Sequence, residues 1–296
     1  MYVYSTYGLG IQSELELPEL VAGTDSNGTV TIRFGKVEPL PDEVDSQFHS
    51  FWATPNETCL CFQGSGAFLV RNGNEIIIQP SPKVDERVLR LAILGPALSM
   101  LLHQRGLLVL HGSAVVVNGQ AASFLGNSGD GKSTMAGVLN RRGHALIADD
   151  LSVVDFDSNG DPLLYPGFPQ LKLWPEAVTS LGDDLNSLAR LHPALEKRAR
   201  HIKQDDFFEN TVALRRLYVL QEADALSIEL VPQQQAFIEL VRHSHDALLL
   251  RQTNSASRHF EQCSRLASIV QMYYLKRPRS LAALPDVAQL IEENLA

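Results

Sequence analysis

The sequence predicts a mixed α/β protein preceded by a small β-rich domain, and three observations support this prediction. Residues 1 to 82 contain short apolar or alternating runs that are typical of strands. A helical stretch follows over residues 85 to 104 and is bent near a Gly-Pro pair. From residue 105 onward, strands and helices surround a glycine-rich loop. We therefore expect a β-rich N-terminal region over residues 1–104 and an α/β domain over residues 105–296.

Strand patterns are clear at several places in the N-terminal region. Residues 30–34 alternate apolar and polar side chains, as a half-buried strand does. Residues 58–62 and 67–70 are apolar runs that fit buried strands. Residues 71–78 predict a hairpin, because an Asn-Gly pair accepts the positive backbone angles of a tight turn.

A segment near the middle of the chain matches the phosphate-binding pattern G-x-x-x-x-G-K-[ST] at every fixed position. It follows an apolar run over residues 120–125 and precedes a helical run over residues 133–142. A loop between a strand and a helix N-terminus turns backbone N–H groups and the helix dipole toward an anion. This segment, called the phosphate loop below, consists of Gly126, Asn127, Ser128, Gly129, Asp130, Gly131, Lys132, Ser133 and Thr134. The pattern predicts binding of a nucleoside triphosphate, with the lysine near the outer phosphates and the following hydroxyl on Mg²⁺.

A second chemical element follows the loop. Residues 144–150 form an apolar strand-like run that ends in Asp149 and Asp150. Carboxylates at the carboxyl end of a strand lie where open α/β sheets bind ligands. One of them could hold Mg²⁺, directly or through water, and the other could accept the proton of an attacking hydroxyl. His111, at the end of another apolar run, is by itself more typical of a structural hydrogen bond than of catalysis.

The other elements of the α/β domain are predicted from apolar runs. Strands are expected at residues 107–110, 114–117 and 217–220, and helices at residues 234–244, 255–273 and 284–294.

The composition argues against several classes of protein. The net charge is −9 and no basic tract is dense, so nucleic acid is not expected as a partner. The start of the chain lacks the basic and apolar segments of a signal peptide. The apolar segment 91–102 is shorter than the roughly 20 residues that span a bilayer, so we expect a buried helix and no membrane partner. Cys59, Cys61 and Cys263 are expected to be buried thiols in a reducing cytoplasm.

Three of these elements, taken in order, resemble the catalytic domain of HPr kinase/phosphorylase, a bacterial family of serine kinases. They are His111-Gly112, the phosphate loop and the run 142–150, and their intervals are similar to those of the family. The resemblance implies a mixed sheet similar to that of phosphoenolpyruvate carboxykinase, with ATP and Mg²⁺ as cofactors. It implies that Lys132 contacts phosphate, that Asp150 is the base toward a serine hydroxyl, and that His111 belongs to the catalytic group. We assign Asp149, with Ser133, to the metal.

The chain departs from that family after the two aspartates. The family has a metal-binding glutamate in an E-x-R-G stretch, whereas residues 163–170 contain no glutamate. Gln170 or Asp149 could substitute for it, or one metal contact is missing. The later signature linked with phosphorylase activity and HPr contact is also not recognisable. We therefore expect neither phosphorylase activity nor HPr as the substrate.

Two further runs are similar to HPr-kinase-related proteins that modify peptides, including lasso-peptide precursor kinases. They are residues 7–15, followed by Pro18-Glu19-Leu20, and residues 168–175. This similarity implies a serine on a peptide as the phosphate acceptor. By its residues alone, Trp174-Pro175 predicts a helix start with a packed aromatic side chain.

Basic residues beyond the loop have two interpretations. Lys172, Lys203, Arg215 and Arg216 could contact phosphates, but a solvated charge is the commoner role for each of them. The run 190–203 could be a mobile segment that closes over substrate, or an ordinary exposed helix.

Three functions remain open from the sequence. We favour an ATP- and Mg²⁺-dependent kinase that acts on a serine of a peptide or protein, with the N-terminal region as a docking or assembly module. A kinase of a small hydroxylated metabolite would use the same active site. A non-catalytic nucleotide-binding regulator would be consistent with the missing glutamate. A homo-oligomer is possible, and the purine preference is left open.

Overall fold

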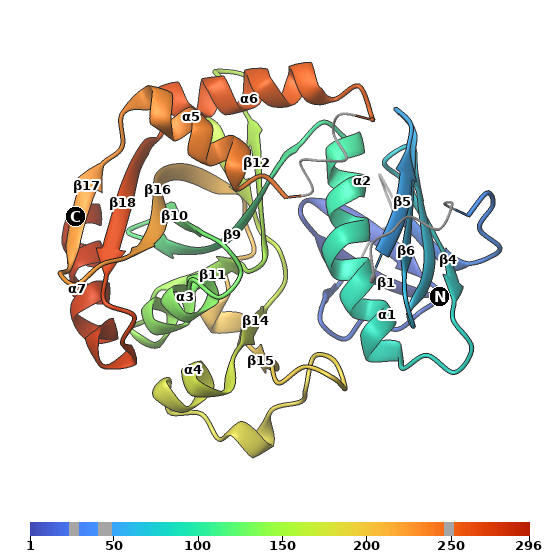
Figure 1. Ribbon diagram of the computed structural model, residues 1–296, viewed down its shortest axis with the longest axis horizontal. Helices are drawn as coiled ribbons and strands as arrows, with labels where there is room; N and C mark the ends of the chain where they lie inside the picture. Colours follow the sequence, from blue (N-terminus) through green and yellow to red (C-terminus); the bar gives the residue numbers. More distant parts are fainter. Residues whose placement is uncertain (24–29, 41–48, 246–251) are drawn as a thin grey trace.

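The computed structural model describes residues 1–23, 30–40, 49–245 and 252–296, and it is a mixed α/β protein as predicted (Figure 1). An N-terminal sheet lies on one side of the molecule. A second sheet with its own helices lies on the other side, and the helices α1 and α2 stand between the two (Figure 1).

The N-terminal sheet has the strand order β3-β1-β2-β4-β8-β7-β6-β5. β4 pairs in parallel with β2 and β8, and the other neighbours are antiparallel. The predicted hairpin is confirmed, since Asn72 and Gly73 turn with φ of 50° and 62° between β7 and β8. The strands are β1 Tyr2–Thr6, β2 Leu9–Ser13, β3 Val21–Ala22, β4 Val30–Phe34, β5 His49–Ala53, β6 Glu57–Phe62, β7 Gly66–Arg71 and β8 Glu75–Pro80.

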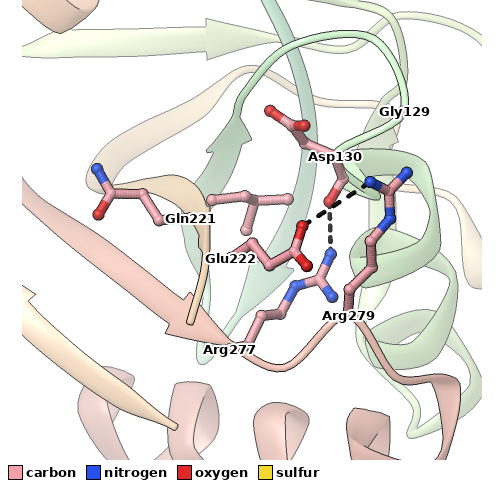
Figure 2. A pocket seen from close by; sticks show the side chains of 7 residues that line it. Gly129, Asp130, Gln221, Glu222, Arg277 and Arg279 are labelled. Carbon is pink, nitrogen blue, oxygen red and sulfur yellow. Dashed lines mark hydrogen bonds and ion pairs between the residues drawn. The ribbon is translucent and has the colours of Figure 1, made fainter. Parts of the chain in front are cut away.

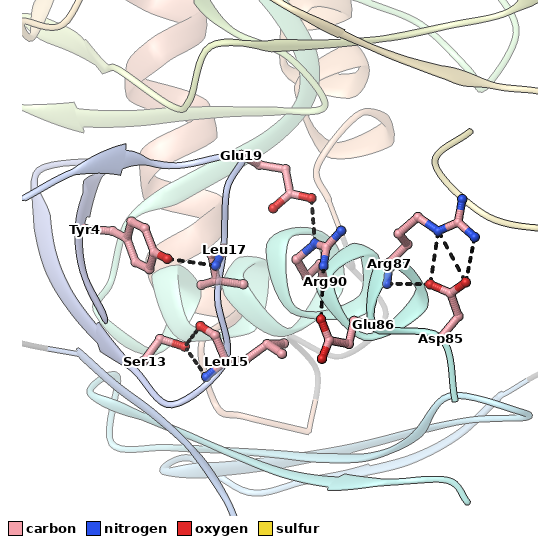
Figure 3. Close-up of polar contacts among 9 residues, drawn as sticks. All are labelled: Tyr4, Ser13, Leu15, Leu17, Glu19, Asp85, Glu86, Arg87 and Arg90. Atoms are coloured by element: carbon pink, nitrogen blue, oxygen red, sulfur yellow. Dashed lines mark hydrogen bonds and ion pairs between the residues drawn. The ribbon is translucent and has the colours of Figure 1, made fainter. Parts of the chain in front are cut away.

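A long helical segment with a break in the middle follows the N-terminal sheet. α1 (Glu86–Ala92) and α2 (Leu98–Gln104) are joined by a π-helical turn over Ile93–Ala97. Pro96 lies in this turn and has no N–H to donate, so the regular hydrogen-bond ladder cannot continue through it. Arg90 of α1 donates to Glu19 at 2.8 Å, which ties the helix to the segment after β2 (Figure 3).

The second sheet has the order β10-β9-β12-β13-β16-β18-β17, with β11 paired to β9. β10 also pairs with β16, so five of these strands close into a ring. The strands, including the separate pair β14 and β15, are β9 Leu108–Val117, β10 Gln120–Leu125, β11 Ala145–Ala148, β12 Leu151–Phe156, β13 Pro162–Tyr165, β14 Gln170–Leu173, β15 Arg198–His201, β16 Val212–Glu222, β17 Ser227–Leu230 and β18 Gln271–Arg277. β10, β16 and β18 run parallel, so their carboxyl ends meet at one edge.

Helices cover both faces of the second sheet (Figure 1). α3 (Lys132–Arg141) and α7 (Leu284–Leu295) contribute to one apolar cluster. α5 (Gln233–Arg242) and α6 (Ala256–Ile269) contribute to another on the opposite side. The short helix α4 (Pro175–Ser180) follows β14. Met135 and Leu139 of α3 are buried.

Two predicted elements are wrong in extent. Residues 107–110 and 114–117 were expected as separate strands, but β9 is continuous. Gly112 lies within it, where a Cβ would approach the hydroxyls of Ser123 and Ser152 to 2.9 Å. The helix expected over residues 255–273 ends at Ile269, because the following residues pair in parallel with β16 as strand β18. Sheet pairing here overrides the local helical pattern.

Two further expectations also need correction. The run 190–203 is not a helix: Arg198–His201 forms β15 and pairs with β14. Of the three cysteines, Cys59 and Cys263 are buried, but Cys61 is partly exposed, and all three are free thiols. Every helix in the described ranges is too short or too polar to cross a bilayer.

Candidate functional site

The phosphate loop lies at the carboxyl end of β10 and leads into α3. Gly129 and Gly131 have φ of 94° and 93°, in the left-handed region that favours glycine. Asp130 orders the loop, because its carboxylate accepts the backbone N–H of Asn127 at 2.5 Å. Residues 127 to 129 are exposed. The chain therefore presents an ordered, accessible turn at a helix N-terminus, an arrangement that can bind an anion.

Lys132 is buried at the start of α3, and its side chain points back to the loop. Its ammonium donates to the backbone carbonyls of Gly126 and Asn127, both at 2.9 Å. Burial lowers the pKa of Lys132, while Asp149 and Asp150 raise it. A positive charge is thus held inside the loop by carbonyls that an incoming phosphate oxygen could replace.

Asp149 follows β11 and is buried among hydrogen-bond donors. One carboxylate oxygen accepts the Ser113 hydroxyl at 2.5 Å, and the other accepts the backbone N–H of Lys172 at 2.8 Å. The Ser133 hydroxyl of the phosphate loop is close enough to this carboxylate to lower its pKa. Burial raises the pKa of Asp149, and these hydrogen bonds oppose the shift. The structure therefore brings together the two residues that we assigned to the metal.

Asp150 lies next to Asp149, but its side chain has different partners. Its φ of 75° places it in the left-handed region, which Asp tolerates better than most residues. The carboxylate accepts the Lys172 ammonium at 2.6 Å, and His111 Nδ1 lies 3.4 Å from its other oxygen. Burial raises the pKa of Asp150, but the charge and hydrogen bond of Lys172, together with the neighbouring His111 and His245, outweigh it and leave the pKa below its ordinary value. Asp150 is therefore ionised at neutral pH.

His111 lies in the middle of β9, beside Asp150. Its Nδ1 is 3.1 Å from the Asp150 backbone carbonyl oxygen, so this nitrogen carries the proton and donates it. Burial lowers the pKa of His111 to about 4, and the nearby charge of Lys132 acts in the same direction. Because His111 is uncharged at neutral pH, Lys172 supplies the cationic charge at Asp150 and His111 contributes a hydrogen bond.

Lys172 and Ser113 complete this group, although the sequence pattern gave them no such role. A solvated charge was the favoured interpretation of Lys172, but the residue is only 9% exposed and is paired with Asp150. Its place in a short apolar strand, between Leu171 and Leu173, was the available signal of burial. Ser113 stands two residues after His111 on β9, a spacing that puts both side chains on one face of a strand.

Other basic candidates do not reach this group. Arg216 pairs in register with Ala122 and Gln271, near the amino ends of β10 and β18 and thus at the far end from the phosphate loop. Arg215 precedes it on the same strand, and Lys203 is exposed. Gln170, the candidate substitute for the family's glutamate, is buried two residues from Lys172 on β14, and both side chains line one cavity.

Arg277 is a further residue at the loop that the sequence pattern did not single out. It ends β18, and its guanidinium donates to the backbone carbonyl of Asp130 at 2.5 Å (Figure 2). A Cβ at Gly131 would come within 2.5 Å of the same guanidinium, so only glycine fits there without movement. The parallel alignment of β18 with β16 and β10 explains how a residue so distant in sequence reaches the loop.

The oxygen donors of the site suit Mg²⁺, but they do not supply a complete set of protein ligands. Within the described ranges, no group of three or more His, Cys, Asp or Glu side chains is arranged to hold a metal ion. Mg²⁺ commonly takes only one or two protein oxygens, with waters and substrate phosphates as its other ligands. The Ser133 hydroxyl and the nearby Asp149 carboxylate are oxygen donors of this kind.

The comparisons with known proteins give little independent information. No protein-family model and no curated protein matches the chain. Among solved structures, the HPr(Ser) kinase/phosphatase from Coxiella burnetii is similar, with a TM-score of 0.34 and 11% identity. That match covers 63% of this chain and 95% of the other.

Proposed function

We propose that this protein is a phosphotransferase that uses ATP and Mg²⁺ to phosphorylate a serine hydroxyl of a peptide or protein, with Asp150 as the base. One observation supports this most directly. An ionised, partly exposed Asp150 lies beside the buried Asp149, and the Ser133 hydroxyl of the phosphate loop is close enough to Asp149 to lower its pKa. A base and a phosphate-binding loop are thus joined through one carboxylate pair, as transfer from a bound phosphate to a hydroxyl requires.

The residues of the chain have separate roles in this reaction. The phosphate loop would hold the outer phosphates through its backbone N–H groups and the Lys132 ammonium. The serine oxygen would attack the γ-phosphorus while the bond from that phosphorus to the bridging oxygen breaks. The hydroxyl proton would pass to Asp150. The ammonium of Lys172 donates a hydrogen bond to this carboxylate and stabilises its negative charge. Positioning dominates such transfers, so the low pKa of Asp150 does not disqualify it as the acceptor of this proton.

Ser133 and Asp149 would hold Mg²⁺, which would neutralise charge on the phosphates of bound ATP. With Asp149 on the metal, its hydrogen bonds from Ser113 and Lys172 would fix the orientation of the carboxylate.

A small cavity supports a peptide acceptor over a free metabolite. It has a volume of about 70 Å³, and Lys172, Gln170 and Arg190 are among its lining residues. Binding sites for whole small molecules usually have several hundred Å³. A single side chain entering beside Lys172, with the rest of the acceptor outside, suits this volume better.

The three cysteines are free thiols, so we place the protein in a reducing cytoplasm.

The test is transfer from γ-labelled ATP to serine-containing peptides encoded near this gene, with Mg²⁺ present. Asp150→Asn should reduce transfer by at least about 100-fold and leave the Kd for ATP within about threefold. Lys132→Ala should weaken ATP binding itself. The matched control is Asp161→Asn, an exposed aspartate in the turn after β12, which should behave as wild type.

The outcomes separate the three functions. The proposal would be supported if wild type and the control Asp161→Asn transfer phosphate to a peptide and the variants Asp150→Asn and Lys132→Ala do not. Transfer to free amino acids or sugars, with none to peptides, would replace it with a metabolite kinase. Tight ATP binding without transfer to any acceptor, unchanged in Asp150→Asn, would indicate a nucleotide-binding regulator.

A further inference from the structure

A groove of about 540 Å³ opens at the phosphate loop. Gly129, Gly131 and Thr134 of the loop line it, and Lys132, Asp149 and Asp150 do not. Its other walls come from Trp174, just before α4, and from the segment between the end of β18 and the start of α7. The loop therefore has two sides, one with the carboxylates and one with this groove.

Side chains at the start of α3 set the direction in which a triphosphate would lie. The Ser133 hydroxyl lies near Asp149 and lowers its pKa, whereas Thr134, the next residue, lines the groove. The phosphoryl group that is transferred must reach Asp150. The other end of the nucleotide must then leave the loop away from Asp150, and the groove begins there.

The size of the groove also fits a nucleoside. The neighbouring cavity at the loop, lined by Glu222, Arg277 and Arg279, has about 30 Å³, room for about one water molecule (Figure 2). The groove is large enough for an aromatic base and a ribose, because small-molecule sites usually have about 300 to 1,000 Å³.

Apolar side chains are exposed in this groove. Trp174 is 43% exposed and Leu281 is 41% exposed, and they come from two segments far apart in sequence. This corrects the expectation of a packed aromatic at residue 174, although the helix start at Pro175 is confirmed. Lys197 Nζ lies 5.3 Å from the centre of the Trp174 ring. A large aromatic ring exposed beside a loop that can bind phosphates offers a stacking surface to a base.

We infer that this groove binds the base and ribose of the donor nucleotide, with Trp174 as the stacking residue. The inference rests on the proposed function, because it takes the phosphate loop as the site of the triphosphate. It assigns an aromatic base to the groove and leaves the acceptor to the cavity beside Lys172.

Two tryptophans make this inference measurable, because Trp52 lies in β5 of the N-terminal sheet and Trp174 in the groove. In Trp52→Phe, Trp174 is the remaining tryptophan, and ATP should change its fluorescence in a saturable way. Inorganic tripolyphosphate, which lacks a base, should bind with little change. By calorimetry, Trp174→Ala should weaken ATP binding roughly tenfold and tripolyphosphate binding by less than about twofold. Trp174→Phe should restore most of the affinity for ATP.

Two results would overturn the inference in distinguishable ways. If calorimetry shows ATP binding with equal Kd in wild type and Trp174→Ala, and the Trp174 fluorescence does not respond, the base lies elsewhere while the proposed function stands. If ATP does not bind to the wild type at all, the proposed function fails and this inference fails with it. A circular dichroism spectrum equal to that of wild type would show that Trp174→Ala is folded.

Discussion

At the scale of single residues, two adjacent aspartates have been given opposite electrostatic environments. Burial raises the pKa of Asp149, which has only neutral hydrogen-bond donors as its direct partners. Asp150 has a direct ion pair with Lys172, and its pKa is below the ordinary value. Two carboxylates in different environments can take different roles, here the proposed metal ligand and the proposed proton acceptor. A backbone φ of 75° at Asp150 directs the two side chains to these separate partners.

Lys172→Met tests the role of this ion pair. Without the ammonium, burial acts on Asp150 against less opposition, so the pKa of Asp150 rises. Because transfer needs ionised Asp150, the acidic limb of the rate profile should move to higher pH, and the rate at pH 7 should fall about tenfold or more. The profile is measured by labelled phosphate transfer between pH 5 and 9.

The matched control for this change is Lys203→Met, which removes an exposed lysine in the same part of the chain. Its pH profile should coincide with that of wild type. An unshifted acidic limb in Lys172→Met, with the protein folded, would contradict the assignment of Asp150 as the base.

At the scale of elements, the helix that carries the phosphate loop is held at its far end by α7. Glu292 of α7 accepts from Arg142 at 2.6 Å and from His144 at 2.9 Å, just after the end of α3. These hydrogen bonds lower the pKa of Glu292 to about 2. The contact fixes α3 against the sheet, and so it contributes to the position of the loop at the other end of the helix.

Glu292→Gln should therefore lower stability in a pH-dependent way. The folded-state pKa lies below the ordinary value, so the contribution of Glu292 is present above about pH 4.5 and is lost as the pH falls toward 2. At pH 7 we expect a loss of about 1 kcal/mol, after allowance for solvent screening of a partly exposed group. Urea unfolding at pH 7 and at pH 3 measures both values.

The neighbouring Glu293 is the control, because it is exposed and accepts only from Gln289 of the same helix among the described contacts. Glu293→Gln should change stability by less than about 0.5 kcal/mol at either pH. An equal loss for Glu292→Gln at both pH values would show that the lost interaction is not electrostatic.

At the scale of the whole molecule, the N-terminal region is part of the folded unit that carries the site. One apolar cluster includes residues of the N-terminal sheet, α1 and α2 together with Val109, Leu151 and Phe168. Tyr7 is 1% exposed, and its hydroxyl donates to the carbonyl of Leu151, the residue after Asp150, at 3.3 Å. Removing the N-terminal region would expose this cluster, so loss of activity after such a deletion would not by itself indicate a docking role.

A shared core predicts that the whole chain unfolds in one transition. Single-tryptophan variants report on the two regions, since Trp52 lies in the N-terminal sheet and Trp174 beside α4. Trp52→Phe leaves Trp174 as the fluorescent probe, and Trp174→Phe leaves Trp52. The midpoints of urea unfolding measured with the two probes should coincide. Tyr7→Ala should lower the free energy of unfolding by about 3 to 5 kcal/mol for both probes.

Tyr2→Ala is the matched control for this change, because Tyr2 is an exposed tyrosine at the start of β1. It should shift the midpoint little. Two separate transitions, with Tyr7→Ala moving only the N-terminal one, would show that the two regions fold independently.

Local pattern in the sequence determined a large part of this protein. The hairpin at Asn72-Gly73, the break at Pro96 and the strand, loop and helix around residues 120–142 follow from backbone preferences of a few adjacent residues. The predicted chemistry of the candidate site likewise rests on the residue types of the phosphate loop and of the two aspartates. Each of these features depends on short-range geometry that a linear pattern records.

Only the tertiary structure decided which distant residues meet. Lys172 and Arg277 reach Asp150 and the phosphate loop because separate strands end nearby, and no local pattern specifies that alignment. Pairing with β16 turned a predicted helix end into β18. Trp174 was expected as a packed aromatic side chain and lies exposed in a groove. Burial and ion pairing are properties of the assembled chain, so the charge state of Asp150 could not be predicted before its partners were placed.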